Sequence, residues 1–393
     1  MPTIQKLDAD RILDSRGEWT LEVTITLGNG LMATASVPKG ISAGRYEAKS
    51  LPLATAIKNV KTSLRNALRG LNPLNQEQID RKMIALDRTV NKSRLGGNAM
   101  LGVSLASARA GALIKKLPLW KHLASLYQKP EIPSRFPLLF MVMIEGGRHG
   151  RGNLEFQEYL MIPKTHNLRP AIEIGTKFYH ALQTNLKNDL GVAAWGIGDE
   201  GAFSPNLKSP LAPFEILSAV AKKLKLQNQT AFGLDAAASE IQKSAKYLFN
   251  FYGQVANRYR LLYLEDAFSE TDFDNFCLLL TSQGQKVWIA GDDLTVTNLS
   301  RMELAYRKKC INSIVIKPNQ IGTLTETLNA VKRARGYGWK VVVSHRGGET
   351  NDAFISDLAV AVGADGFKLG APARGERIAK YNRLLEIEKE MVS

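Results

Sequence analysis

Two hydrophobic patterns divide the chain. In residues 18–36, apolar and polar side chains alternate through WTLEVTITLGNGLMATAS around a Gly-Asn-Gly turn, which predicts a β-hairpin. In residues 96–116, GGNAMLGVSLASARAGALIKK places small residues at helical spacing, which predicts a helix packed closely against its neighbours. We therefore expect the N-terminal part to form a small α+β domain.

A different pattern repeats towards the C-terminus: short apolar runs rich in β-branched residues, each followed by an amphipathic segment of helical length. The runs are TAFGLD, LLYLED, VWIAGDD, INSIVIK, KVVVSHR and ADGFKLG. Polar residues close them at intervals of 23 to 30 residues, at Asp235, Glu265, Asp292, Lys317, His345 and Lys368. This spacing is typical of a βα unit, and the continuous apolar strands indicate a parallel sheet buried on both faces. The predicted fold is α/β, a TIM-like (β/α)8-type barrel with these six residues at one mouth.

The boundary between the two parts is predicted in LYQKPEIPSRFP, residues 126–137, where prolines and polar residues interrupt both patterns. This gives an N-terminal domain of residues 1–132 and a barrel domain of residues 133–393.

Composition narrows the class of protein. The 393 residues are 45% apolar, enough for a large core. The apolar run FPLLFMVMI, residues 136–144, is too short to span a bilayer, and the N-terminus lacks the apolar region of a signal peptide. Only Cys277 and Cys310 are present, so a disulfide framework is not expected. We expect a soluble cytoplasmic protein.

The net charge of +15 favours an acidic partner, which could be nucleic acid, a membrane surface or an anionic substrate. Charge alone does not choose among them. The densest basic groups, near Lys222 and Arg307, are typical of solvated helix faces, and no zinc-finger spacing or Arg/Gly tract indicates a dedicated nucleic-acid module.

The stretch GIGDEGAF, residues 196–203, has the G-x-G-x-x-G spacing of a dinucleotide-binding turn, but it carries Asp199 and Glu200 where phosphate would lie. A dinucleotide site also needs a helix that begins directly after the glycines. Pro205 and Pro210 follow instead. The residues therefore favour a loop that presents an acid.

The predicted barrel mouth combines three carboxylates, Asp235, Glu265 and Asp292, with positive or titratable groups. Converging carboxylates repel one another unless a cation neutralises them, and oxygen ligands of this kind suit Mg²⁺. A lysine opposite such an ion can act as a base if nearby cations lower its pKa, and Lys368 would do this for Lys317. The predicted reaction is removal of a proton α to a carboxylate.

A set of motifs covering nearly the whole chain, in order, resembles the enolase family. These motifs are DSRG (residues 14–17), VPKGISAGRYEA (37–48), LGGNAMLGVSLA, FQEY, GDEG, LDAAASE, LEDAF, GDDLTVTN, IKPNQIGTLTET, SHRGGET and KLGAPARGER. The resemblance implies the enolase kind of barrel and the reversible dehydration of 2-phosphoglycerate to phosphoenolpyruvate. It also implies a phosphorylated small-molecule substrate, two Mg²⁺ ions per site and a homodimer formed through the DSRG region, with Arg16 as a candidate for an intersubunit ion pair.

The resemblance also implies a role for each matching position. The implied catalytic residues are Lys317 as the base at C2, Glu200 as the acid at the C3 hydroxyl, Glu158, His149 and His345. The implied substrate contacts are Gln157, Arg346 at the phosphate, Lys368 at the carboxylate and Ser42. The implied ligands of the tighter metal are Asp235, Glu265 and Asp292, while Ser42 would reach the second metal.

The chain departs from the family pattern at several positions. VPKGISAG stands where VPSGASTG is usual, which adds Lys39, and Gly347 replaces a serine that would bind phosphate. Arg346 or Lys39 could offset that loss. Glu145 stands in EGG where NGG is usual.

The sequence is compatible with two alternative functions of different class. One is an active metal-dependent hydratase. The other is a binding protein on the same scaffold, with little or no catalysis, whose basic surface holds RNA or another acidic partner. A related acid-sugar dehydratase is disfavoured by the GDEG and SHR motifs.

Overall fold

The N-terminal part is built on a three-stranded antiparallel sheet in the order β1-β2-β3. The structure, a computed structural model, describes residues 2–40, 44–128, 135–191 and 196–392. The strands are β1 (Ile4–Leu13), β2 (Trp19–Leu27) and β3 (Met32–Ser36). Alternate residues of β2, such as Val23 and Ile25, are fully buried, so one face of the sheet covers a core. The predicted hairpin is confirmed, with β1 as a further strand beside it.

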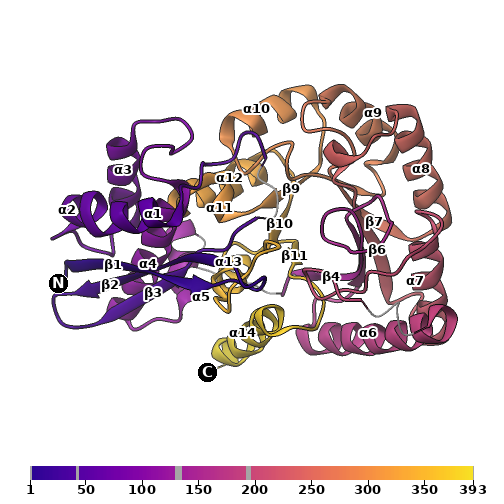
Figure 1. Cartoon of the computed structure of the whole chain (residues 1–393), viewed down its shortest axis with the longest axis horizontal. Coiled ribbons are helices and arrows are strands. Elements are labelled where there is room, and N and C mark those ends of the chain that lie inside the picture. Colours follow the sequence, from indigo (N-terminus) through magenta and orange to yellow (C-terminus); the bar gives the residue numbers. More distant parts are fainter. Residues whose placement is uncertain (1, 41–43, 129–134, 192–195, 393) are drawn as a thin grey trace.

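Helices cover the buried face of this sheet (Figure 1). They are α1 (Leu53–Asn59), the π-helical turn Val60–Leu64, α2 (Arg65–Leu68), α3 (Gln76–Asp87), α4 (Gly97–Lys115) and α5 (Leu119–Tyr127). The small residues of α4 allow the close packing that its sequence predicts. A Cβ atom at Gly102 would lie 2.5 Å from Val23 Cγ2, so only glycine fits there without displacing the sheet.

The C-terminal part is a closed eight-stranded barrel in the order β10-β11-β4-β5-β6-β7-β8-β9. The strands are β4 (Leu138–Glu145), β5 (Glu158–Pro163), β6 (Thr230–Asp235), β7 (Leu261–Glu265), β8 (Trp288–Gly291), β9 (Ser313–Ile316), β10 (Lys340–Ser344) and β11 (Gly366–Lys368). The six predicted strands are β6 to β11, and they pair in parallel.

The strand β5, which the sequence pattern did not identify, departs from this arrangement, because it pairs antiparallel with both β4 and β6. A loop of twelve residues, 146–157, joins β4 to β5. A parallel neighbour needs a crossover that returns the chain to the opposite end of the sheet, whereas an antiparallel neighbour can begin at the same end. The antiparallel pairing places the end of β4, at Glu145, opposite the start of β5, at Glu158.

Helices surround the barrel on the outside (Figure 1). They are α6 (Leu168–Leu190), α7 (Ala212–Lys223), the 3₁₀ turn Ala238–Glu240, α8 (Ala245–Arg258), α9 (Phe273–Gln283), α10 (Leu299–Lys308), α11 (Pro318–Ile321), α12 (Leu324–Gly336), α13 (Phe354–Ala361) and α14 (Gly375–Val392). None of the helices in the described parts is long and apolar enough to cross a membrane.

Partly buried polar contacts connect the two parts. Arg109 on α4 pairs with Asp352 before α13 at 2.6 Å. Asp80 on α3 accepts hydrogen bonds from the backbone N–H and the hydroxyl of Thr325 at 2.9 and 2.6 Å. The predicted domain boundary at residues 132 and 133 lies outside the described residues, and the division stays a prediction.

Candidate active site

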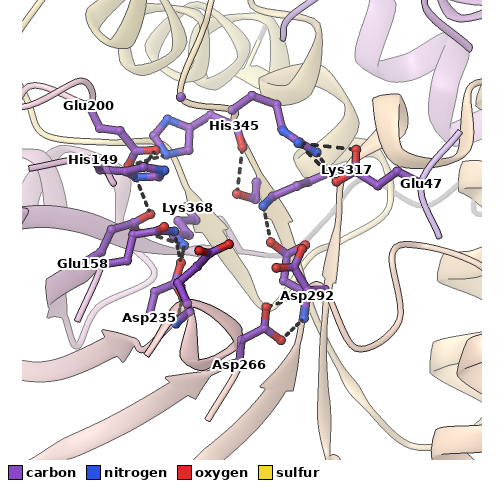
Figure 2. A pocket seen from close by; sticks show the side chains of 17 residues that line it. Glu47, His149, Glu158, Glu200, Asp235, Asp266, Asp292, Lys317, His345 and Lys368 are labelled. Carbon is purple, nitrogen blue, oxygen red and sulfur yellow. Dashed lines mark hydrogen bonds and ion pairs between the residues drawn. The ribbon is translucent and has the colours of Figure 1, made fainter. Parts of the chain in front are cut away.

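A polar pocket lies at the carboxyl ends of the barrel strands (Figure 2). Parallel strands present their C-terminal residues at one mouth, and the strand-end polar residues gather there as the sequence predicts. The predicted site residues that line the pocket are His149, Gln157, Glu158, Glu200, Asp235, Asp292, Lys317, His345, Arg346 and Lys368. Glu265 is fully buried and contacts Lys368. Ser42 lies outside the described residues.

Lys368 stands at the centre of one carboxylate group. Its Nζ lies 2.8 Å from Asp235 Oδ2, 3.0 Å from Glu158 Oε2 and 3.0 Å from both oxygens of Glu265. Burial lowers the pKa of Lys368, but the surrounding carboxylates outweigh burial and raise it well above its usual range. The lysine therefore carries a positive charge, and it forms ion pairs with protein carboxylates.

Asp266, Asp292 and Asp293 form a second acidic group, in which each residue offers an oxygen atom within 4.8 Å of the others. Asp266 supports the other two, because its carboxylate accepts hydrogen bonds from the backbone N–H groups of Asp292 and Asp293 at 2.9 and 2.8 Å. Burial and the charge of Asp292 raise the pKa of Asp293 to about 7. The group is therefore a concentration of negative charge that favours a cation.

Lys317 extends into the pocket from the end of β9, and its Nζ pairs with Asp292. Burial by itself lowers the pKa of Lys317, but the Asp292 carboxylate outweighs it and the pKa is raised. Arg346 and Lys368 do act in the predicted direction, but the ion pair with Asp292 dominates because it is a direct contact.

His149, Glu158 and Glu200 form the opposite side of the pocket in Figure 2. His149 Nδ1 lies 3.3 Å from Glu200 Oε1 and 3.4 Å from Glu158 Oε1. Burial lowers the pKa of His149, yet Glu200 and Glu158 together raise it to about 9. Burial and the charge of Glu200 raise the pKa of Glu158. The three groups therefore hold a proton among them at neutral pH.

His345 adds a neutral imidazole to this cluster. Its Nε2 lies 3.1 Å from Glu200 Oε2, and its Nδ1 is 2.9 Å from Nη1 of Arg377. Because a guanidinium only donates, Nδ1 accepts this hydrogen bond, and the ring proton therefore resides on Nε2, facing Glu200. Burial lowers the pKa of His345 to about 4, so the ring is uncharged at neutral pH.

Arg346 is paired with Glu47 of the N-terminal part, with Nη2 to Oε1 at 3.2 Å, and both residues line the pocket. The predicted phosphate-binding cation is therefore held by a carboxylate. Lys39, proposed as a substitute for the missing serine at Gly347, instead pairs with Glu18 at 2.8 Å. Its side chain is 52% exposed.

Sequence reasoning missed Glu47, Asp266, Asp293 and Arg377 as members of the site. Each lies inside a motif that carries the family resemblance, and Asp266 and Asp293 directly follow predicted ligands. Their side chains act mainly on other site residues, which strand-end position alone does not indicate.

The donor set fits a hard divalent cation. The candidate ligands are buried carboxylates, and burial together with the charge of Asp235 raises the pKa of Glu265 well above its usual range. Oxygen-only carboxylate sites suit Mg²⁺. In the described arrangement Asp235 and Glu265 converge on Lys368, and Asp292 contacts Lys317, so ammonium groups supply the positive charge.

The fold and the pocket together define an enzyme of the barrel class. Candidate acid and base side chains lie on two sides of its pocket, and carboxylates that could bind a metal ion lie between them. Residues 134–393 match the family described as "Enolase, C-terminal TIM barrel domain", and residues 4–123 match "Enolase, N-terminal domain".

Curated relatives agree over the full length. The chain is 39% identical over 424 positions to "Enolase B" of Dictyostelium discoideum, covering 99% of this chain and 95% of that protein. It is 39% identical over 417 positions to "Enolase" of Methanopyrus kandleri (100% and 96% covered) and 37% identical over 430 positions to "Enolase" of Solanum lycopersicum (100% and 96% covered). The chain belongs to the enolase family, a family of hydro-lyases.

Proposed function

We propose that the protein is a Mg²⁺-dependent phosphopyruvate hydratase that interconverts 2-phospho-D-glycerate and phosphoenolpyruvate plus water. One observation carries the proposal. Lys317 and the His149–Glu200–Glu158 cluster line the same pocket from two sides. Dehydration requires a base at C2 and an acid at the C3 hydroxyl on one substrate, and a two-sided arrangement supplies both.

Lys317 is the proposed base. It directly follows β9 and its side chain is only 13% exposed, and the strand itself, Ser313–Ile316, carries no titratable side chain. To accept the C2 proton it must first release its own proton to solvent, so its contact with Asp292 has to weaken when substrate is bound. Arg346 and Lys368 favour that loss, because both lower the pKa of Lys317.

Glu200 is the proposed acid, with His149 and Glu158 as its proton store. Burial raises the pKa of Glu200, but His345 and His149 outweigh burial and hold it well below its usual value. Glu200 is thus a carboxylate whose proton is available from His149 at 3.3 Å. A proton moved from this cluster to the C3 hydroxyl would leave with it as water. Gln157, whose amide lies 3.3 Å from Asp235, lines the same side.

Substrate anions would be bound by the two pocket cations that now contact carboxylates. Arg346 would exchange Glu47 for the phosphate, where a planar guanidinium binds two oxygens at once. Lys368 would contact the substrate carboxylate. Asp235, Glu265 and Asp292 would hold one Mg²⁺ and Ser42 a second. When bound, the metal ions would supply positive charge beside the substrate carboxylate, which makes the C2 proton easier to remove.

The basic binding-protein alternative receives less support from the surface. Several exposed cations are neutralised by neighbouring acids rather than gathered into a field of one sign. Arg307 and Arg333 both contact Glu303, and Lys308 contacts Asp274.

The expected homodimer stays a prediction, and Arg16 contacts Asp14 and Glu18 within its own chain.

The test is the absorbance of phosphoenolpyruvate formed from 2-phosphoglycerate with and without Mg²⁺. Wild type should turn over only with metal. Lys317→Ala and Glu200→Gln should each lower kcat by about 10²–10⁴-fold, while the surface changes Lys332→Ala and Glu388→Gln should leave it unchanged. A wild type that is silent at saturating metal and substrate, yet binds RNA with a steep salt dependence, would favour the binding protein.

A further inference from the structure

The segment that carries Glu200, residues 198–202, is a turn outside the regular elements, so its position depends on groups around it. Other parts of the barrel hold its carbonyl oxygens. The donors are Arg374 to Gly198 O at 3.1 Å, Arg377 to Asp199 O at 3.1 Å, the Ala371 N–H to Glu200 O at 3.0 Å and the Tyr179 hydroxyl to Gly201 O at 2.8 Å. Donors alone do not fix the turn, because its own N–H groups also need acceptors.

Glu145 is the acceptor for the N–H groups that flank the acid. It is the last residue of β4 and is fully buried. Its Oε1 accepts from the N–H of Ala202 at 2.8 Å and from the N–H of Glu200 at 3.1 Å, and its Oε2 lies 3.2 Å from the N–H of Glu200. One rigid strand end therefore binds the backbone of the acid itself.

The turn is shaped to receive this carboxylate. A Cβ atom at Gly198 would lie 2.2 Å from Glu145 Oε2. Any other residue at position 198 would therefore clash with Glu145, and glycine allows the close approach. Within the described part of the chain, Glu145 has no ion-pair partner. A buried carboxyl group without an ion-pair partner favours its neutral form, and the two backbone N–H groups satisfy its acceptor oxygen.

We propose that Glu145 is the positioning residue of Glu200, fixing the acid from behind through the backbone while the two histidines contact its side chain. This inference rests on the proposed function. Glu145 would act in a neutral form, since burial and the charge of Glu200 raise its pKa to about 8. The titratable groups around it are Glu200 and His149 on the neighbouring loops, Glu158 on β5 and Tyr179 on α6.

The test compares Glu145→Gln with Glu145→Leu. Glutamine keeps an acceptor oxygen for the two N–H groups and resembles the neutral acid, whereas leucine has a similar size and no acceptor. Leu64→Ala, which removes buried apolar volume far away in the N-terminal part, is the control for lost stability. The readouts are kcat and KM for 2-phosphoglycerate with Mg²⁺, and amide hydrogen exchange of the peptide containing residues 198–203.

Glu145→Leu should lower kcat on the order of 10²-fold with little change in KM and should lose exchange protection in residues 198–203. Glu145→Gln should retain kcat within about threefold below pH 7 and keep that protection, and Leu64→Ala should keep both. The proposal is overturned if Glu145→Leu keeps wild-type kcat and protection, or if Glu145→Gln is as impaired as Glu145→Leu.

If wild type has no turnover, the proposed function fails. The exchange data then decide the positioning role by themselves.

Discussion

Replacement of Arg377 by methionine tests how the site is held together. Arg377 is fully buried and donates to His345 Nδ1 at 2.9 Å and to the carbonyl oxygens of Arg346 and Gly347, both at 2.7 Å. Methionine fills much of the volume and donates nothing. The change therefore removes the interactions that fix the His345 ring and the segment that carries Arg346.

The magnitude follows from the two shortest bonds. A hydrogen bond to a charged donor contributes ~1.5–3 kcal/mol, so the loss of the contacts to the carbonyl oxygens of Arg346 and Gly347 should lower the free energy of unfolding by about 3–6 kcal/mol. This is a large share of the ~5–15 kcal/mol typical of a folded domain. The kcat should also fall roughly ten- to a hundredfold, because His345 loses the partner that selects its tautomer.

Urea unfolding and phosphoenolpyruvate formation measure the two effects separately. Arg383→Met is the matched control, because Arg383 pairs with Asp357 and Glu390 at 2.7 Å on the outside of the barrel. The control should lose stability and keep kcat. The reasoning is refuted if Arg377→Met lowers the unfolding free energy by less than ~1 kcal/mol and keeps kcat within twofold of wild type.

Three further predictions concern pH, metal and the contact between the two parts. The pKa of Glu145 is raised from its usual 4.5 to about 8 in the folded chain. The stability that this group contributes is therefore lost as pH rises from about 5 to 8. Glu145→Gln should flatten that part of a curve of Tm against pH. Mg²⁺ should raise Tm by relieving repulsion among the carboxylates, and Asp292→Asn should remove most of that increase in a thermal-shift assay. Asp80→Ala should lower the unfolding free energy by about 2–4 kcal/mol, measured in urea, with kcat unchanged because Asp80 contacts Thr325 and Ser104 outside the pocket.

Regular elements were predictable where the hydrophobic period was strong. The alternation in residues 18–36 predicted β2 and β3, and the six apolar runs predicted β6 to β11. The strands β4 and β5 were not identified. The residues of β4 are buried on both sides, so its sequence has no alternation to distinguish a strand from another apolar segment, and no local pattern encodes the antiparallel direction of β5.

The positions of the site residues were predictable from the strand ends, but their contacts were not. Asp235 and Lys317 each close an apolar run, which is enough to place them at one mouth. That Lys368 contacts three carboxylates, or that Lys317 is held by Asp292 with a raised pKa, depends on which strands are neighbours around the closed barrel.

The sequence by itself determined the barrel, its repeat and the charged residue types at its mouth, because hydrophobic period and strand-end position are local properties of the chain. Only the tertiary structure decided which residues support the site from behind. Glu145 and Arg377 lie 232 positions apart in the sequence, yet both hold the turn that carries Glu200. Contacts between distant segments depend on the closure of the barrel, and the local sequence around each residue contains no sign of its partner.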